Sequence, residues 1–247
     1  EISLGLVGSE MCIRDSCKIV PLDKQTINEG AEYMSQTAQH TNETKDKHRS
    51  HAYAKVWLFF MYYWIIFGIG CYFGQFLPME WRRPLSLALM VLVLITLVFQ
   101  RARKYGLVIS HIYAIILGLL SYAMFTSYLQ NLGPEVFYKN IILAIGAFIA
   151  FGIVGFFLIN DASSMGRYLF VTLLALIIAS IIGMFIHNPI FHTIITVVSL
   201  LLFLLYTLYD FNRMKRGQFS PREMGFNLFI NLLNIIKDIL RLANRFR

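Results

Sequence analysis

Long apolar runs with almost no charge recur along this chain, and they constrain its fold more than any other feature. Most of them reach the roughly 20 residues that an α-helix needs to cross a bilayer core. In lipid, backbone polar groups must be satisfied internally, so only helices and closed barrels span a membrane. Barrel strands are about 10 residues long and alternate in polarity, whereas these runs are longer and apolar on every side. We therefore predict six membrane-spanning helices, at residues 54–77, 85–99, 105–129, 137–159, 168–186 and 190–209.

The composition agrees with a membrane protein. Only 15% of the residues are charged and 57% are hydrophobic, whereas a soluble domain carries about 25% charged residues. A further helical segment at 226–243 is more polar than the first six. The predicted fold class is all-α, a polytopic membrane helical bundle of six spanning helices plus a more polar seventh.

The polar part of the chain is short and lies at its N-terminal side. Residues 1–16 resemble a translated sequencing-adapter read-through, and we interpret them as an artefact and exclude them from functional reasoning. Residues 17–53 contain too few large apolar side chains to bury a core, which predicts a mobile tail. Residues 54–247 are then the seven-helix membrane domain.

Basic residues between the runs predict the orientation. With the N-terminus inside, the inner segments carry twelve lysines and arginines against three outside, which are Arg82, Arg83 and Lys139. Because basic residues favour the cytoplasmic side, the N-terminus is predicted to be cytoplasmic. These charges flank spans and form no folded basic face, so we expect no nucleic-acid partner.

The segment 226–243 repeats polar residues at helical spacing, which places them on one face of a helix. Two alternatives remain open. The helix lies in the membrane interface as a basic anchor, or it enters the bundle with its polar face inward, which we favour. Full crossing would put its last arginines outside, against the charge rule, and partial or re-entrant insertion would avoid this. The polar residues are Asn227, Asn231, Asn234, Asp238, Arg241 and Arg245.

Asp210 closes the sixth predicted span and is the main ionisable candidate. A carboxylate at a helix C-terminus is disfavoured by the helix dipole, which predicts a partner such as Arg213. The alternative is a solvated aspartate at the membrane interface. Nucleophile-elbow, zinc-protease and nucleotide-binding motifs are absent from the sequence, so we predict neither an enzyme nor a bound cofactor or metal.

The order of several short motifs resembles the Bax inhibitor-1 family (transmembrane Bax inhibitor motif, bacterial YccA/YetJ type). These motifs are FGQFLP at the end of the first span, PLS opening the second, QRARKYG after it, and LYDFNRMKRG before the polar seventh helix. The resemblance covers about residues 59–242. It implies a bundle with a central hydrophobic helix in the bacterial cytoplasmic membrane. It also implies a pH-sensing calcium leak, in which two aspartates on the sixth and seventh helices share a proton near a latch arginine.

The family's residues carry over only in part. The sixth-helix aspartate falls on Asp210, but the seventh-helix aspartate falls on Asn231, which cannot titrate. We therefore expect an Asp210–Asn231 hydrogen bond and a gate less sensitive to protons than in two-aspartate relatives. The latch arginine falls on Gln100 or Arg101, and Arg101 keeps the charge. The predicted gate and pH-sensing residues are Asp210, Asn231 and Asp238, with Arg101, Arg213, Asn227 and Asn234 as latch or polar partners.

The resemblance implies a calcium-leak ion channel with a polar gate between the sixth and seventh helices. The alternative is a non-conducting regulatory protein that binds a membrane protease or another partner. Deleting residues 18–50 would separate the two, if partner binding is lost while calcium flux remains. A small-solute transporter is a third possibility, but no internal repeat is evident. The expected partners are the lipid bilayer, calcium ions as cargo, and a membrane protease.

Overall fold

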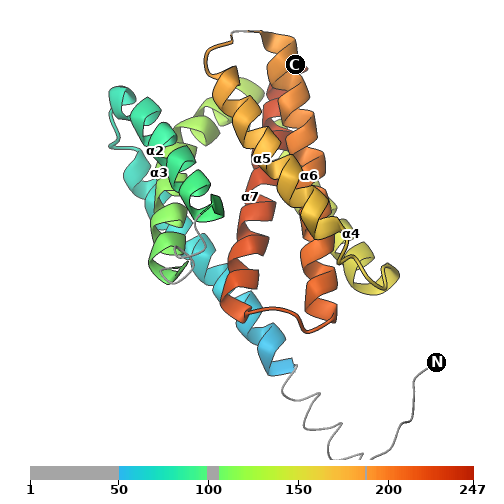
Figure 1. Cartoon of the computed structure of the whole chain (residues 1–247). Helices are drawn as coiled ribbons and strands as arrows, with labels where there is room; N and C mark the ends of the chain where they lie inside the picture. The colour runs from blue at the N-terminus through green and yellow to red at the C-terminus, as the bar shows by residue number, and fades with distance from the viewer. Residues whose placement is uncertain (1–49, 99–105, 187) are drawn as a thin grey trace, which may run out of the picture. The chain divides into compact units, whose positions relative to one another are not determined.

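The computed structural model describes residues 50–98, 106–186 and 188–247, and these residues contain helices and no strand. The all-α prediction is therefore confirmed for this part of the chain. The predicted artefact and most of the predicted tail lie outside it, and so does Arg101. The helices are Ser50–Gly74, α2 (Met79–Val98), α3 (Gly106–Leu132), α4 (Pro134–Ile153) with its π-helical continuation η2 (Val154–Leu158), α5 (Met165–Gly183), α6 (Pro189–Lys215) and α7 (Pro221–Arg245) (Figure 1).

Five of these helices are long and apolar enough to cross a bilayer, namely Ser50–Gly74, Val108–Leu132, Pro134–Leu158, Met165–Gly183 and Pro189–Lys215. The second predicted span is helical as part of α2, which begins before the predicted residue 85 and includes Glu80, two arginines and Pro84. α2 is not in the group of five. The polar α7 is outside it as well.

Local sequence signals explain where α6 begins and ends. Asn188 caps it by accepting hydrogen bonds from the backbone N–H groups of Ile190 (2.9 Å) and Phe191 (3.4 Å). It ends where Gly217 adopts a positive φ of 71°, in a motif that satisfies the last carbonyls and favours glycine. The helix therefore continues to Lys215, and the predicted end at residue 209 was wrong. Asp210 lies inside α6 and not at its C-terminus.

Two contacts fix how far α7 extends along the bundle. The guanidinium of Arg222 lies beside Gly106, the first residue of α3. At the other end, Nη1 of Arg247 donates a hydrogen bond to the carbonyl of Asn131 at 2.6 Å. Both pairs are 116 residues apart, so α3 and α7 run parallel over the full length of α3. Whether α7 crosses the bilayer fully or inserts partially stays a prediction. We call the two ends of the bundle the Gly106 end and the Asn131 end.

The centre of the membrane domain is α7. No residue between Met224 and Leu240 is exposed, and the helix packs against α3, α4 and α6. Gly225 allows it to contact the backbone of the first helix, because a Cβ there would meet the carbonyl of Val56 at 2.8 Å. The interfacial-anchor alternative is therefore excluded. The resemblance had implied a hydrophobic central helix, but here the central position belongs to the most polar one.

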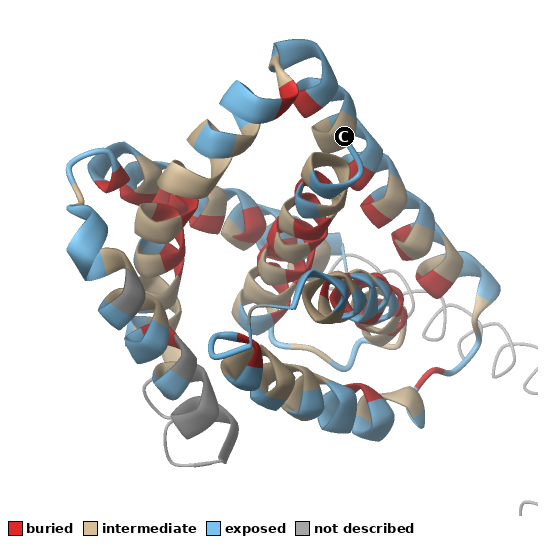
Figure 2. Cartoon of the chain, turned by 90° about the horizontal axis from the view of Figure 1, so that it is seen from above, coloured by how far each residue is buried: buried red, intermediate tan, exposed pale blue. Residues whose placement is uncertain are grey.

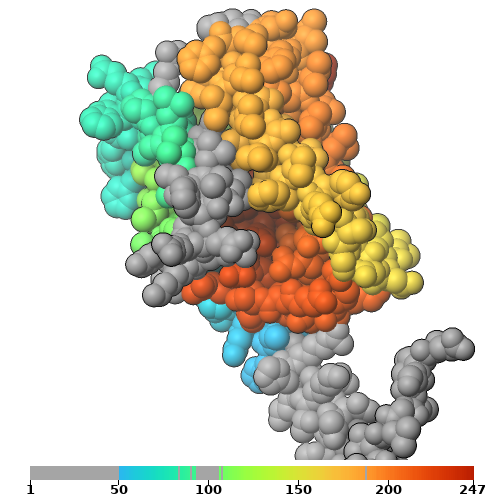
Figure 3. All heavy atoms as spheres, in the orientation of Figure 1, coloured from blue at the N-terminus to red at the C-terminus, as the bar shows by residue number. Residues whose placement is uncertain are grey.

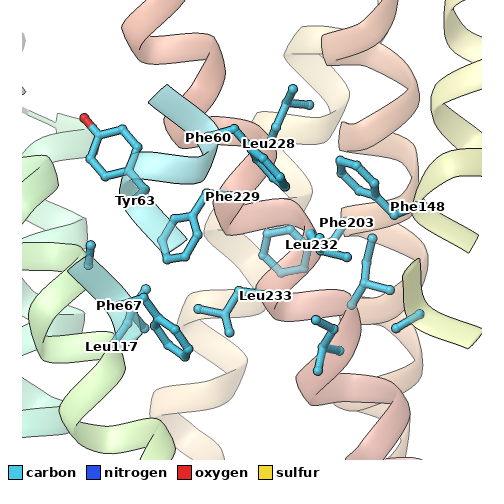
Figure 4. Packing of buried hydrophobic residues seen from close by; sticks show 14 of the residues in the cluster. Phe60, Tyr63, Phe67, Leu117, Phe148, Phe203, Leu228, Phe229, Leu232 and Leu233 are labelled. Carbon is cyan, nitrogen blue, oxygen red and sulfur yellow. The ribbon is translucent and has the colours of Figure 1, made fainter. Parts of the chain in front are cut away.

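Aromatic and aliphatic side chains surround α7 and face lipid elsewhere. The ring of Phe229 contacts Tyr63, Trp64 and Phe67 of the first helix (Figure 4). Buried residues lie on the inner faces of the helices, and exposed ones lie on the outer faces (Figure 2). At most 28% of any candidate span is buried, so most of its apolar surface faces outward, as expected for contact with lipid chains.

Candidate functional site: buried polar contacts between α6 and α7

The predicted contact between the sixth and seventh helices is present in the structure. Nδ2 of Asn231 on α7 donates a hydrogen bond to Oδ2 of Asp210 on α6, at 2.9 Å. The two residues are only 4% and 2% exposed, so the bond is shielded from solvent. A hydrogen bond to a carboxylate is stronger than one between neutral groups, and more so where water is excluded. This bond therefore ties α6 to α7 within the membrane domain.

The other oxygen of the Asp210 carboxylate, Oδ1, lies near a cation. Nη1 of Arg213, one turn further along α6, lies 3.6 Å from Oδ1 of Asp210. The guanidinium also lies over the ring of Tyr209, 5.7 Å from its centroid. Asn227, one turn before Asn231, interacts with the same carboxylate. Asp210 is thus a buried aspartate with three polar neighbours, and the alternative of a solvated interfacial aspartate is wrong.

A second polar contact joins the same two helices closer to the Asn131 end. Oγ of Ser199 on α6 donates a hydrogen bond to Oδ2 of Asp238 on α7, at 2.5 Å. Nη1 of Arg241 lies 3.6 Å from the other oxygen of Asp238. Asp238 is seven residues beyond Asn231, a rise of about 10 Å. It therefore belongs to a separate contact and is not a neighbour of Asp210.

The loop between η2 and α5 is fastened to α6 by Asn212, which is fully buried. Its side-chain oxygen accepts the N–H of Ala162 at 2.9 Å. Its amide nitrogen donates to the carbonyls of Gly155 (3.2 Å) and Ile159 (2.8 Å). Both carbonyls lie in the last turn and the cap of η2, where a helix leaves its carbonyls without intrahelical partners. The side chain of Asn212, two residues after Asp210, therefore satisfies the hydrogen bonds of three backbone groups.

Asp161, in the same loop, also contacts the end of α6. Oδ1 of Asp161 accepts hydrogen bonds from the hydroxyl (2.5 Å) and the backbone N–H (2.8 Å) of Ser163, and it pairs with Arg216 at 2.8 Å. The Ser163 hydroxyl and N–H, followed by Arg216, hold the pKa of the Asp161 carboxyl below its ordinary value. A lowered carboxyl pKa stabilises the fold above the unfolded-state value, and this contribution is lost as the pH falls through the lowered one. The contact therefore persists at neutral pH.

We expect Asn212→Ala to lower the free energy of unfolding by about 3 kcal/mol, because three buried backbone groups lose their partner. Thermal unfolding in detergent or lipid would measure the change. Asn140→Ala is the matched control, since the amide of Asn140 donates only to the carbonyl of Val136 in its own helix. If both variants melted like the wild type, the bonds of Asn212 would not fasten the loop.

The predicted site residues are brought together only in part. Asp210, Asn231, Arg213 and Asn227 form one group, whereas Asp238 forms another. Asn234 donates to the carbonyl of Ile230 in its own helix, at 3.0 Å, so it joins neither. Arg101 lies outside the described residues, and its latch role stays a prediction.

Sequence reasoning missed Ser199 and Asn212. Ser199 lies in an apolar run without any local signal. Asn212 lies in the run YDFNRMK, and the sequence alone indicates a solvated asparagine near a helix end. No group of three or more His, Cys, Asp or Glu side chains that could hold a metal occurs among the described residues.

The fold and these contacts define a polytopic α-helical membrane protein whose polar central helix is held to its neighbour by buried hydrogen bonds. A family model described as "Inhibitor of apoptosis-promoting Bax1" matches residues 49–247. The chain belongs to the Bax inhibitor-1 family.

Similar proteins occur in bacteria. An uncharacterized protein of Helicobacter pylori is 33% identical over 88 residues, which is 35% of this chain and 38% of that protein. An uncharacterized protein of Campylobacter jejuni is 25% identical over 187 residues, 71% of this chain and 72% of that protein. An uncharacterized membrane protein of Vibrio cholerae is 30% identical over 82 residues, 33% of this chain and 37% of that protein. The chain thus spans 38% of the length of the first of these relatives.

Proposed function

We propose that this protein is a calcium-leak channel of a bacterial cytoplasmic membrane, with its gate between α6 and α7 and its N-terminus in the cytoplasm. The observation that carries the proposal is the buried hydrogen bond between Asp210 and Asn231. Ionisable residues inside a membrane bundle are rare and mark ion pathways or proton relays. Carboxylate and amide oxygens are also the ligand types that calcium prefers.

The proposed gate depends on the charge of Asp210. The cation of Arg213 and the amide of Asn231 both favour the ionised carboxylate. With an asparagine opposite, no second carboxylate competes for charge, so closure does not depend on a shared proton. The wild-type leak is therefore expected to depend less on pH than a leak gated by two aspartates.

The test is calcium flux into proteoliposomes between about pH 6 and 8, the range in which a shared carboxylate proton would titrate. We expect the wild-type flux to vary less over this range than the flux of Asn231→Asp, which has a second carboxylate at the contact. Asp210→Asn removes the charge-assisted contact and should raise the flux by a similar factor at every pH. A steep acid-dependent change in the wild type that Asp210→Asn abolishes would contradict this gate.

A further inference from the structure

The cation beside Asp210 is held only loosely by the carboxylate itself. Nη1 of Arg213 lies 3.6 Å from Oδ1 of Asp210, whereas a charge-assisted hydrogen bond to a carboxylate is about 2.7–2.9 Å long. The side chain of Arg213 is also 29% exposed, and holding a long arginine side chain in one position costs rotamer entropy. The carboxylate alone therefore does not fix the guanidinium.

A second contact of the guanidinium is the ring of Tyr209. The central guanidinium carbon lies over this ring, 5.7 Å from its centroid, within the distance at which a cation is attracted to an aromatic face. Arg213 follows Tyr209 by four residues and Asp210 by three, and these are the two spacings at which side chains meet on a helix. Arg213 therefore lies between the side of α6 that carries Asp210 and the side that carries Tyr209.

The ring of Tyr209 packs against the start of α5. A Cβ at Gly166, in the first turn of α5, would lie 2.6 Å from the hydroxyl oxygen of Tyr209 and 2.9 Å from the ring carbon that bears it. The ring therefore occupies space that any side chain at residue 166 would take. A continuous series of contacts leads from α5 to α7, through Gly166, Tyr209, Arg213, Asp210 and Asn231.

Among the candidate spans, α5 is the least buried. Only 6% of its apolar stretch is buried, against 22–28% for the other four. Among the elements from α2 to α7, it packs closely against α6 alone. Figure 3 shows the yellow-orange atoms of α5 at the surface, along the front of the bundle. Local stability is lowest where few apolar contacts are buried, so α5 can shift at lower cost than the central helices.

We infer that Tyr209 is a positioning residue, which transmits the position of α5 to the Asp210–Asn231 contact through the guanidinium of Arg213. When α5 moves away from α6, the ring loses its support and the guanidinium leaves the carboxylate. A nearby opposite charge favours the ionised carboxylate, so the charge-assisted bond from Asn231 weakens. The effect on calcium flux rests on the proposed leak, whereas the coupling between Tyr209 and Arg213 does not.

A double-mutant cycle tests this coupling without calcium. Tyr209→Leu should lower the melting temperature in lipid or detergent by about 2–4 °C, through the loss of one cation–π contact. It should lower the melting temperature clearly less when Arg213→Gln has already removed the cation. Tyr209→Phe keeps the ring and should cause less than half the loss caused by Tyr209→Leu. Equal losses from Tyr209→Leu with and without Arg213 would overturn the inference.

Calcium flux into proteoliposomes measures the effect on the proposed gate. Tyr209→Leu should raise the flux about threefold, in the same direction as Asp210→Asn. It should raise the flux no further in the Asp210→Asn background, because Arg213 then has no carboxylate to hold in its ionised form.

The role of α5 is tested by adding a methyl group at each of its ends. Gly166→Ala displaces the ring of Tyr209 and should raise the flux as Tyr209→Leu does. Gly183→Ala is the matched control, because a Cβ there would meet its nearest atoms at 3.4 Å, an ordinary contact. Its flux should equal that of the wild type.

The outcomes separate the role of Tyr209 from the proposed function. If the wild type leaks calcium and folded Tyr209→Leu leaks at the same rate, the inference fails and the leak stands. If the wild type and all variants are silent, the proposed leak fails, and the melting cycle by itself supports or overturns the coupling between Tyr209 and Arg213.

Discussion

Asn231→Asp is expected to make the calcium flux of this protein steeply dependent on pH. The side chain of Asn231 lies 2.9 Å from the carboxylate of Asp210, so the variant places two carboxylates in direct contact. Two carboxylates at this distance cannot both be ionised at low cost, and the pair retains a proton in the buried site. At alkaline pH the proton is lost and the two charges repel, which separates α6 from α7.

The direction of the response follows from this repulsion. Flux through Asn231→Asp should fall as the pH is lowered from about 8 to 6, by roughly tenfold, which corresponds to about 1.4 kcal/mol. The same proteoliposome assay measures it. The double variant Asp210→Asn/Asn231→Asp is the matched control, since it exchanges the two groups and keeps a single carboxylate. A double variant as pH-sensitive as Asn231→Asp alone would show that the response does not come from the pair.

The membrane character of this chain follows from its apolar runs alone, because backbone groups in lipid leave few alternatives to a helix. The helix boundaries follow less well. The sixth predicted span ended at residue 209 because Asp210 is charged, yet the helix continues to Lys215. The buried partners of Asp210 compensate its charge, and a hydropathy pattern cannot anticipate partners from another helix.

The position of α7 shows the same limit more strongly. Its polar spacing is compatible with a helix on the membrane surface, and its arginines argue against full crossing. Tertiary contacts place it inside the bundle and not on its surface, since Asn231 and Asp238 have partners on α6 and Phe229 on its apolar side packs against the first helix. The Asp210–Asn231 pair could be predicted because the family pattern aligns these two positions. Ser199 could not, because nothing in its own neighbourhood distinguishes it from a packing residue.

Glycines show how packing separates residues that look alike in sequence. Glycine inside a membrane helix can permit close helix contact, and α4 with η2 contains three, Gly146, Gly152 and Gly155. A Cβ at Gly155 would overlap the carbonyl oxygen of Leu208 and lie 2.8 Å from its Cα, and one at Gly152 would lie 2.9 Å from the ring of Phe211. A Cβ at Gly146 would meet nothing within 4 Å. Gly152 and Gly155 therefore lie at close helix contacts, whereas Gly146 faces outward.

Gly155→Leu should therefore lower the free energy of unfolding by about 4 kcal/mol or more, because a backbone cannot yield as a flexible side chain does. Gly146→Leu is the matched control. It should leave stability unchanged or raise it by up to about 1 kcal/mol, since leucine favours a helix more than glycine does. Thermal unfolding in lipid or detergent distinguishes them, and equal melting temperatures would contradict the close approach of η2 to α6.

The same substitution should also affect the proposed gate. Gly155 contacts Leu208, two residues before Asp210, and its carbonyl accepts a hydrogen bond from Asn212, two residues after it. A leucine at this position pushes α6 away from η2 on the side opposite the α7 contact or breaks the Asn212 bonds. In either case, folded Gly155→Leu should show an altered calcium flux, whereas Gly146→Leu should not. Unaltered flux in a folded Gly155→Leu protein would show that the gate does not depend on the position of α6 against η2.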